Sequence, residues 1–244
     1  MTDQGEQSGT ADASGTRGGK DAGQRSPLGI LSLDALLCGG LPEGNSVLLQ
    51  GAPGTGKTVL GMQFLEAGIT QFSEPGLMIT FEEHPRRLYR DALALGWDFE
   101  GFEANRQLLV VFTSPQVFLK ELETNHYAGL IRDYGLRRVV VDSLTQFEAE
   151  AQSTEAVRVR FTRIVNALRR CGLTTLMTSE AESREPTFRV TPEEYLADTI
   201  IQLSNSQSGG QRVRSLEILK NRGSAHSNTQ HPFTIEFQGL HIQP

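Results

Sequence analysis

Residues 46–58 read SVLLQGAPGTGKT, an apolar run followed by a glycine-rich loop that ends in a lysine and a threonine. The loop matches the pattern G-x-x-x-x-G-K-[ST] and lies between an expected strand and an expected helix. Gly51, Gly54 and Gly56 allow the backbone to curl so that its N–H groups converge on phosphate oxygens, and the helix expected to begin near Lys57 adds its positive end. The stretch therefore predicts a nucleotide-binding site at the end of a strand.

The side chains of this loop have separate expected roles. Lys57 should reach the β- and γ-phosphates of ATP, and Thr58 should offer its hydroxyl to Mg²⁺. Thr55 and Val59 complete the set of loop residues expected to contact the nucleotide. The alternative, a glycine-rich turn with a chance lysine, is disfavoured because the strand, the whole motif and the helix occur together.

Short apolar runs alternate with longer amphipathic segments along the rest of the chain. Such alternation predicts an α/β fold with a mainly parallel sheet, flanked by helices and joined by right-handed crossovers. Five runs have the composition of strands buried on both faces. They are residues 46–50, 76–81, 108–113, 138–143 and 173–179.

The clearest helix is predicted over residues 154–170, where apolar side chains form one stripe and Gly172 offers a stop. Five arginines lie mostly off that stripe, and an acidic stretch precedes them, which favours a solvated face over a nucleic-acid face. From Asp198 onward, DTIIQLS, RVRSLEILK and PFTIEFQ have the character of strands, with the turn sequence SNSQSGGQ between the first two. They predict an antiparallel extension at one edge of the sheet.

Length and composition indicate one large domain. The chain has 244 residues, of which 38% are hydrophobic and 21% charged, as in a single globular core. Residues 1–26 carry no aromatic or branched aliphatic side chain and are expected to be a disordered tail. The folded domain is therefore expected to cover residues 27–244.

Charge and cysteine content bound the partners and the compartment. The formal net charge of -6 gives no support to general attraction toward nucleic acid or an acidic membrane. Cys38 and Cys171 are the two cysteines, and their spacing suits neither a metal site nor a disulfide framework. No apolar run approaches the roughly 20 residues of a membrane span, and no signal-peptide pattern occurs. We expect a cytoplasmic protein with no membrane partner.

An acidic residue is expected across the sheet from the loop, because Mg²⁺ held by one hydroxyl and phosphates usually needs a carboxylate to order its waters. Asp142, at the end of the run RRVVVDS, fits that role. By itself an aspartate at a strand end is more often a cap or turn residue. The upstream loop favours the metal role, with contact expected through water.

Two adjacent carboxylates, Glu82 and Glu83, follow the apolar run that ends at Phe81. That strand should end on the side of the sheet where α/β folds bind ligands. Side chains alternate along a strand, so the two carboxylates are expected to point in different directions, one toward the γ-phosphate. A carboxylate there could activate a water that attacks phosphorus. The equal alternative is a solvated strand end before a helix begun by Pro85.

Several separated segments together resemble the KaiC family of RecA-like ATPases. They are GGLPEGNSVLLQGAPGTGKT, ITFEE, RRVVVDS, YLADTIIQLS and SLEILKNRGSAHSNTQHPFTI, and the similarity covers about residues 28–244. The resemblance implies a RecA-type core, ATP hydrolysis, and a homo-oligomeric ring, commonly a hexamer, with nucleotide at subunit boundaries. It also implies that Glu82 activates the attacking water and that Glu83 is its partner.

The segment LKNRGSAH carries three basic residues, Lys220, Arg222 and His226, which an extended backbone would place on one face. The resemblance implies that Lys220 and Arg222 act on the γ-phosphate of a neighbouring subunit, and that Ser224 and His226 contact its nucleotide. An arginine in such a position is worth about 10³ to 10⁵ in rate. Without the resemblance, a basic surface hairpin would be the simpler interpretation.

One departure from the family matters. Where the autophosphorylating domain of the clock protein that names the family has an adjacent Ser-Thr pair, residues 194–198 here are Glu-Tyr-Leu-Ala-Asp. Autokinase activity is therefore not supported, and Tyr195 is expected to pack at an interface rather than accept phosphate. The chain is closer to the hydrolysing domain.

Three functions remain open at this stage. The first is a slow ATPase whose nucleotide state sets ring assembly and binding of an unidentified regulatory protein. The second is a RecA- or RadA-like DNA-binding ATPase; it needs basic loops near the ring axis, but residues 143–156 and 181–195 are acidic or balanced. The third is an ATP-bound scaffold with almost no turnover, because rate depends on the fine placement of Glu82 and the trans-acting residues.

Overall fold

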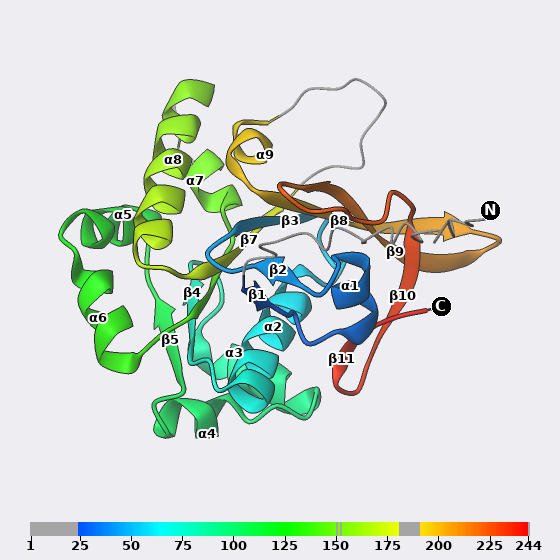
Figure 1. Cartoon of the computed structure of the whole chain (residues 1–244), viewed down its shortest axis with the longest axis horizontal. Helices are drawn as coiled ribbons and strands as arrows, with labels where there is room; N and C mark the ends of the chain where they lie inside the picture. The colour runs from blue at the N-terminus through cyan, green and yellow to red at the C-terminus, as the bar shows by residue number, and fades with distance from the viewer. Residues whose placement is uncertain (1–23, 150, 152, 181–190, 244) are drawn as a thin grey trace, which may run out of the picture.

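The structure, a computed structural model, describes residues 24–149, 151, 153–180 and 191–243 (Figure 1). Among these residues, nine strands form one sheet in the order β11-β10-β9-β8-β3-β7-β6-β4-β5, and β1 and β2 form a separate antiparallel ribbon. The strands are β1 Arg25–Ser26, β2 Leu41–Pro42, β3 Ser46–Gly51, β4 Gly76–Thr80, β5 Leu108–Phe112, β6 Arg138–Asp142, β7 Thr174–Glu180, β8 Thr199–Ser208, β9 Gln211–Asn221, β10 His231–Glu236 and β11 Gly239–Ile242.

The sheet is parallel from β8 to β5 and antiparallel from β8 to β11. The predicted α/β architecture, with a mainly parallel sheet and an antiparallel C-terminal extension, is therefore confirmed. All five apolar runs are strands, within one or two residues of the expected bounds. The last strand, β11, was not predicted, because its four residues show no strong alternation.

Helices cover both faces of the sheet (Figure 1). They are α1 Leu31–Leu36, α2 Lys57–Phe72, α3 Pro85–Ala94, α4 Phe99–Ala104, α5 Pro115–Glu123, α6 His126–Tyr134, α7 Thr145–Ala149, α8 Thr154–Arg170 and α9 Pro192–Leu196. Along β3, Val47 and Leu49 pack into the core under α1–α4, while Leu48 packs into the core under α5–α9. Alternate residues of one buried strand thus belong to two cores. Of the helices described, none has the length and apolarity needed to span a membrane.

Local signals explain the bounds of α8, which are those predicted. The Ser153 hydroxyl accepts a hydrogen bond from the Ala156 N–H at 3.2 Å, and Gly172 adopts a φ of 71° after the last turn. Ser153 is thus an N-cap, and Gly172 supplies the left-handed residue that commonly ends a helix. Three arginines of α8 have protein partners: Arg160 bonds the Phe147 carbonyl, Arg163 pairs with Glu123, and Arg169 pairs with Asp198.

The folded chain begins earlier than residue 27, the predicted start of the domain. Arg25 and Ser26, assigned to the tail, pair with β2, and Ser26 is 1% exposed. The remainder of the predicted tail, residues 1–23, lies outside the described residues, as do residues 181–190 of the segment considered for DNA binding.

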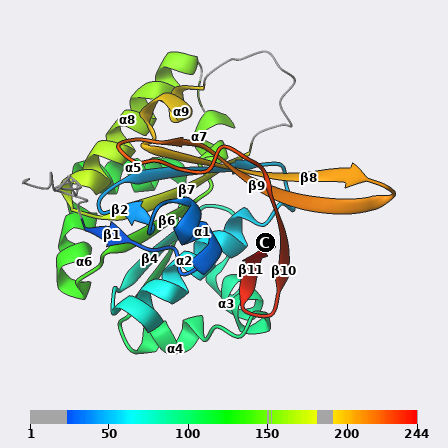
Figure 2. The same cartoon turned by 45° about the vertical axis from the view of Figure 1, so that its right-hand side comes forward.

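The segment SNSQSGGQ is mostly strand instead of turn. β8 continues to Ser208 and pairs with β9 as far as Gln211. The turn is only Gly209 and Gly210, with φ values of 58° and 82°; positive φ at both positions suits a two-residue hairpin turn. Figure 2 shows this hairpin projecting from the body of the molecule.

A buried arginine joins β6 to the end of α2. The Arg138 side chain is 0% exposed, its Nε lies 2.5 Å from Glu74 Oε2, and its Nη1 donates to the Phe64 carbonyl at 2.9 Å. Its guanidinium also lies 4.6 Å from the centre of the Phe64 ring. Gly68 leaves the space for it, since a Cβ there would lie 2.5 Å from Arg138 Cδ. Glu74 is the carboxylate that balances this buried charge.

Asp198 joins three elements at the amino end of β3. Its carboxylate accepts from the Ser46 N–H at 3.0 Å, the Ser46 hydroxyl at 2.8 Å and Arg169 at 2.5 Å. Burial alone would raise the pKa of Asp198, but the bonds from Ser46 and the charge of Arg169 outweigh it and hold the pKa below its ordinary value. The folded state therefore favours the ionised carboxylate.

We expect Glu74→Gln to lower the free energy of unfolding by about 3 kcal/mol, because it removes the carboxylate that is paired directly with the buried Arg138. Glu123→Gln is the matched control, since the Arg163–Glu123 pair is 61% and 59% exposed and should contribute at most about 1 kcal/mol. Urea unfolding of both variants measures the difference. Equal losses in the two variants would contradict the assigned role of Arg138.

We expect the destabilisation caused by Asp198→Asn to depend on pH. Because the folded-state pKa of Asp198 lies below the ordinary 3.8, its contribution is fully present above that value and is lost as pH falls through the folded pKa. Urea unfolding at about pH 7 and about pH 3.5 should therefore give a larger wild-type-to-variant gap at the higher pH. Asp133→Asn, at an exposed position on α6, is the control; a gap that widens in acid would refute this account.

Candidate functional site

The phosphate-binding loop connects β3 to α2, as predicted. Gly56 precedes α2 with a φ of 106°, and a Cβ on it would lie 2.6 Å from Ile235 Cδ1. A Cβ on Gly51 would lie 2.5 Å from the Leu203 carbonyl oxygen. Gly51 is therefore required by the close approach of the β8 backbone, and Gly56 by its positive φ. The first turn of α2 has no side-chain cap and no acidic residue, which leaves its N–H groups and positive dipole end for an anion.

Lys57 lies at the centre of the charges around the loop. Its ammonium donates to the Gly51 carbonyl at 2.7 Å and to the Ala52 carbonyl at 3.2 Å. Burial lowers the pKa of Lys57, and the carboxylates of Glu180, Asp142 and Glu82 act in the opposite direction. A half-buried ammonium at the start of a helix is suited to bind a phosphate group.

Asp142 and Thr58 meet directly. The Thr58 hydroxyl donates to Asp142 Oδ2 at 2.7 Å, and the Thr178 hydroxyl of the neighbouring strand β7 donates to Oδ1 of the same carboxylate. Hydroxyl and carboxylate oxygens are the ligands that Mg²⁺ prefers. The two residues predicted for the metal therefore lie together and have suitable chemistry.

Glu82 and Glu83 differ from the expectation in their backbone. β4 ends at Thr80, and residues 81–83 form a bend, fixed by the Thr80 hydroxyl, which accepts from the Glu83 N–H and donates to the Glu83 carbonyl, both at 3.1 Å. The alternation argument fails because the strand does not continue, and both carboxylates line one cavity. Glu82 accepts a hydrogen bond from Gln146.

That cavity brings together the predicted residues of the loop, the paired glutamates and Asp142. Its volume is about 170 Å³. It is lined by Pro53, Gly54, Lys57, Thr58, Thr80, Glu82, Glu83, Asp142, Ser143 and Glu180. Of the other loop residues, Thr55 is buried and its hydroxyl donates to the Ala52 carbonyl, while Val59 packs against the core.

The C-terminal residues predicted for the site do not line this cavity. They are Lys220, Arg222, Ser224 and His226. Lys220 pairs with Ile200, and Asn221 with Thr199, which faces Val47 near the start of β3. The phosphate loop begins four residues further along β3, at Gly51. At ~3.3 Å per residue, Asn221 is ~13 Å from the start of the loop along the strands, and Lys220, whose partner Ile200 faces Leu48, is ~10 Å from it. Lys220 and the loop do not meet within one chain.

The extended backbone expected for the basic segment ends at Asn221. The chain leaves the strand after Asn221 and turns at Gly223, with a φ of 76°. Lys220 Nζ donates to carbonyls at the end of α9, including that of Ala197 at 2.6 Å, and Arg222 Nη1 lies 3.5 Å from Asp198 Oδ1.

Nearby polar groups complete this C-terminal segment. The Ser224 hydroxyl accepts from Arg25 at 3.0 Å, and His226 is half-buried. The Arg222 side chain remains 63% exposed, so it is accessible from outside the chain.

Three residues of the site were not predicted. Glu180 ends β7, as Asp142 ends the adjacent β6, and the rule that places ligands at the carboxyl edge could have identified it. Thr178, a hydroxyl within an apolar strand, is a weaker signal. Gln146 had no signal at all, because its contact with Glu82 depends on how α7 packs.

Comparison with known proteins identifies the family. A sequence model of the family described as "ATPase: KaiC" matches residues 26–244. The circadian clock oscillator protein KaiC of Synechococcus elongatus is 38% identical over 226 residues, covering 88% of this chain and 43% of the relative. The protein of the same name from Parasynechococcus marenigrum is 36% identical over 232 residues, covering 91% and 45%. The chain thus spans less than half the length of these curated relatives.

A solved structure gives the same result for the fold. The crystal structure of a KaiC-like protein from the hyperthermophilic archaeon Pyrococcus horikoshii superposes with a TM-score of 0.81 at 31% identity. The match covers 91% of this chain and 99% of the archaeal chain.

Proposed function

Because the chain belongs to the KaiC family of ATPases, we propose that it binds ATP with Mg²⁺ and hydrolyses it slowly within a homo-oligomeric ring. The observation that carries the proposal is the single cavity that Lys57, Thr58, Asp142 and the two glutamates line. A cation, a pair of hard oxygen ligands and a base are the groups that phosphoanhydride hydrolysis needs. Family membership supports nucleotide binding, and the hydrolytic step is our inference.

Each group has a proposed task. The loop N–H groups and Lys57 bind the phosphates, and Thr58 and Asp142 hold Mg²⁺, with water between Asp142 and the metal. The metal supplies neutralisation of the phosphate charge when bound. Thr178 keeps the Asp142 carboxylate oriented by donating to the oxygen that Thr58 does not use.

Glu82 is the proposed base. It accepts the proton of the water that attacks the γ-phosphorus, and Gln146 orients its carboxylate. The N–H and the carbonyl of Glu83 both hydrogen-bond the Thr80 hydroxyl. These bonds fix the bend that carries Glu82. Glu83 therefore supports the base and adds negative charge beside it.

Lys220 and Arg222 are proposed to act on the nucleotide of a neighbouring subunit, with Ser224 and His226 in contact with it. Support comes from their position at the amino end of β3, since their own loop lies at the opposite end. The exposed Arg222 guanidinium can approach a second chain. A ring, which we propose to be a hexamer, lets every subunit give these residues to one neighbour and receive them from the other.

The biological role that we propose is regulatory. Nucleotide state would control assembly and binding of an unidentified partner protein in the cytoplasm. The DNA-binding alternative gains no support from the arginines of α8, because Arg160, Arg163 and Arg169 have partners within the chain.

We expect Glu82→Gln to lower phosphate release at saturating ATP by at least about 100-fold, because the amide cannot accept the proton. Binding of a fluorescent ATP analogue should stay within a few-fold of wild type. Glu83→Gln should lose less, and Glu123→Gln, outside the cavity, should keep wild-type activity. Wild-type turnover by both cavity variants would rule out the proposed chemistry.

We expect Arg222→Ala to lower turnover by about 10³-fold, and mixing it with Glu82→Gln to restore activity. In a randomly mixed ring, an Arg222→Ala subunit keeps Glu82 and receives Arg222 from a Glu82→Gln neighbour at about one quarter of the interfaces. Phosphate release after subunit exchange measures the recovery. A mixture of Arg222→Ala and Lys220→Ala, both altered on the donating side, is the control and should stay inactive.

Two results would refute the trans arrangement. One is a failure of the Glu82→Gln mixture to regain activity although native mass spectrometry detects mixed rings. The other is a monomeric protein at every ATP and Mg²⁺ concentration.

A further inference from the structure

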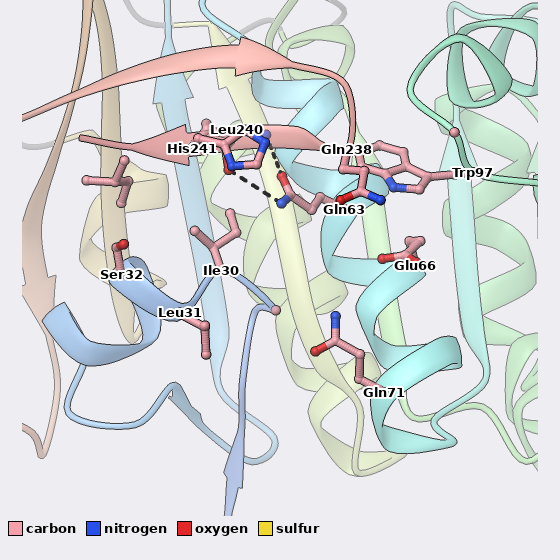
Figure 3. A pocket seen from close by; sticks show the side chains of 13 residues that line it. Ile30, Leu31, Ser32, Gln63, Glu66, Gln71, Trp97, Gln238, Leu240 and His241 are labelled. Atoms are coloured by element: carbon pink, nitrogen blue, oxygen red, sulfur yellow. Dashed lines mark hydrogen bonds between the residues drawn. The ribbon is translucent and has the colours of Figure 1, made fainter. Parts of the chain in front are cut away.

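A second cavity, of about 480 Å³, opens on the flank of α2 away from the phosphate loop (Figure 3). Its walls come from the start of α1, the middle of α2, the Gly96–Trp97 turn and β11. The volume falls within the range of small-molecule pockets. Neither the proposed hydrolysis nor the proposed ring contact uses it.

Among the residues that line this cavity, Glu66 has the one carboxylate and His241 the one imidazole. Glu66, half-buried on α2, lines it and bonds only Thr70, one helical turn away; no cation lies within ion-pair distance of it in the part of the chain that the structure describes. Burial raises the pKa of Glu66, as expected for a carboxylate without a counter-charge. No lysine or arginine is among the lining residues.

The neutral lining residues also suit a cation with an apolar body. The carboxamide groups of Gln71 and Gln238 lie on either side of Glu66, as Figure 3 shows, and the indole of Trp97 forms a wall. Ile30 and Leu240 supply apolar surface. Carboxylate, carboxamide and indole groups are a set that recognises organic ammonium and guanidinium ions.

The walls are fixed before any ligand arrives. The Gln63 amide accepts from the Leu240 N–H at 2.8 Å and donates to the Leu240 carbonyl at 3.4 Å, tying α2 to β11. At Gly239, with a φ of 101°, a Cβ would lie 2.5 Å from Gln63 Oε1 and 2.9 Å from the Trp97 ring. This close packing pre-organises the cavity and lowers the entropic cost of binding.

A metal ion fits less well. Within the described residues, no group of three or more His, Cys, Asp or Glu side chains could hold a metal, and one carboxylate with carboxamides gives too little charge for a dehydrated divalent ion.

We propose that this cavity binds a small organic cation, an amine or guanidinium group on a short aliphatic chain, with Glu66 as its counter-ion. The cation would bond to Glu66 and to the carboxamide oxygen of Gln71, and its chain would lie against Trp97 and Ile30.

The chain contains a single tryptophan, and it lines this cavity, so intrinsic fluorescence reports on the site directly. We would titrate the full chain with agmatine and with spermidine, using 1,4-butanediol as the uncharged probe, at constant ionic strength. We expect at least one of the two amines to give a saturable change in Trp97 emission and the diol to give none. Calorimetry under the same conditions provides the affinity.

Three variants make the test specific. Glu66→Gln should weaken binding of the amine at least about tenfold, by removing the counter-charge. Gln71→Glu should strengthen it several-fold by adding a second carboxylate. Glu43→Gln, at an exposed position outside the cavity, should bind as wild type. Circular dichroism establishes that each variant is folded.

The proposal is overturned if neither amine changes the emission up to about 10 mM, a weak limit of specific binding. It is also overturned if Glu66→Gln binds within about twofold of wild type, or if Glu43→Gln loses as much affinity. Loss of hydrolysis in any of these variants does not bear on it, because the readout is binding.

Discussion

The central constraint on this molecule is the position of β3, which is hydrogen-bonded to β7 on one edge and to β8 on the other and is buried along its whole length. A strand with both edges and both faces covered cannot shift, so its two ends are fixed points. The carboxyl end carries the phosphate loop. The amino end is held by Asp198 through Ser46, and Arg222 lies on the same aspartate. The same rigid strand therefore carries the loop proposed to bind nucleotide at one end and, at the other, the arginine proposed to act on the nucleotide of a neighbouring subunit.

Residues whose behaviour depends on near neighbours in sequence could be predicted. The loop, the five apolar strands and the helix that begins after Ser153 all have local causes, namely glycine conformations, apolar runs and a cap. The bend at Phe81 is an exception: its cause, the Thr80 hydroxyl bonding the Glu83 backbone, is local, but it has no sequence pattern as clear as a cap or an apolar run. The contacts of Lys220 and Arg222 could not be predicted, because they depend on the carbonyls at the end of α9 and on Asp198. Gln146, Thr178 and Glu180 reach the site through packing and strand order.

Buried charges in this fold are of two kinds. Arg138 with Glu74, and Asp198 with Arg169 and Ser46, have their counter-charges and hydrogen bonds within the chain. Their role is to stabilise the folded chain. Lys57 and Glu66 differ, because the first is satisfied mainly by backbone carbonyls and the second has only a threonine hydroxyl. Both lie on α2 and line cavities. Both are therefore available to a ligand, unlike the two structural ion pairs.

The hairpin of β8 and β9 has one further consequence. β3 pairs with β8 only as far as Leu203, and β10 pairs with β9 only as far as Arg214. Within the described residues, the part of the hairpin beyond these points, up to the turn at Gly209 and Gly210, has no third strand beside it. Because this part of the hairpin contributes no residue to either hydrophobic core, changes in its length and sequence should cost the fold little stability. The turn at its tip is therefore a suitable place to insert an epitope or attach a fluorophore, because it lies outside the cavity proposed to bind nucleotide.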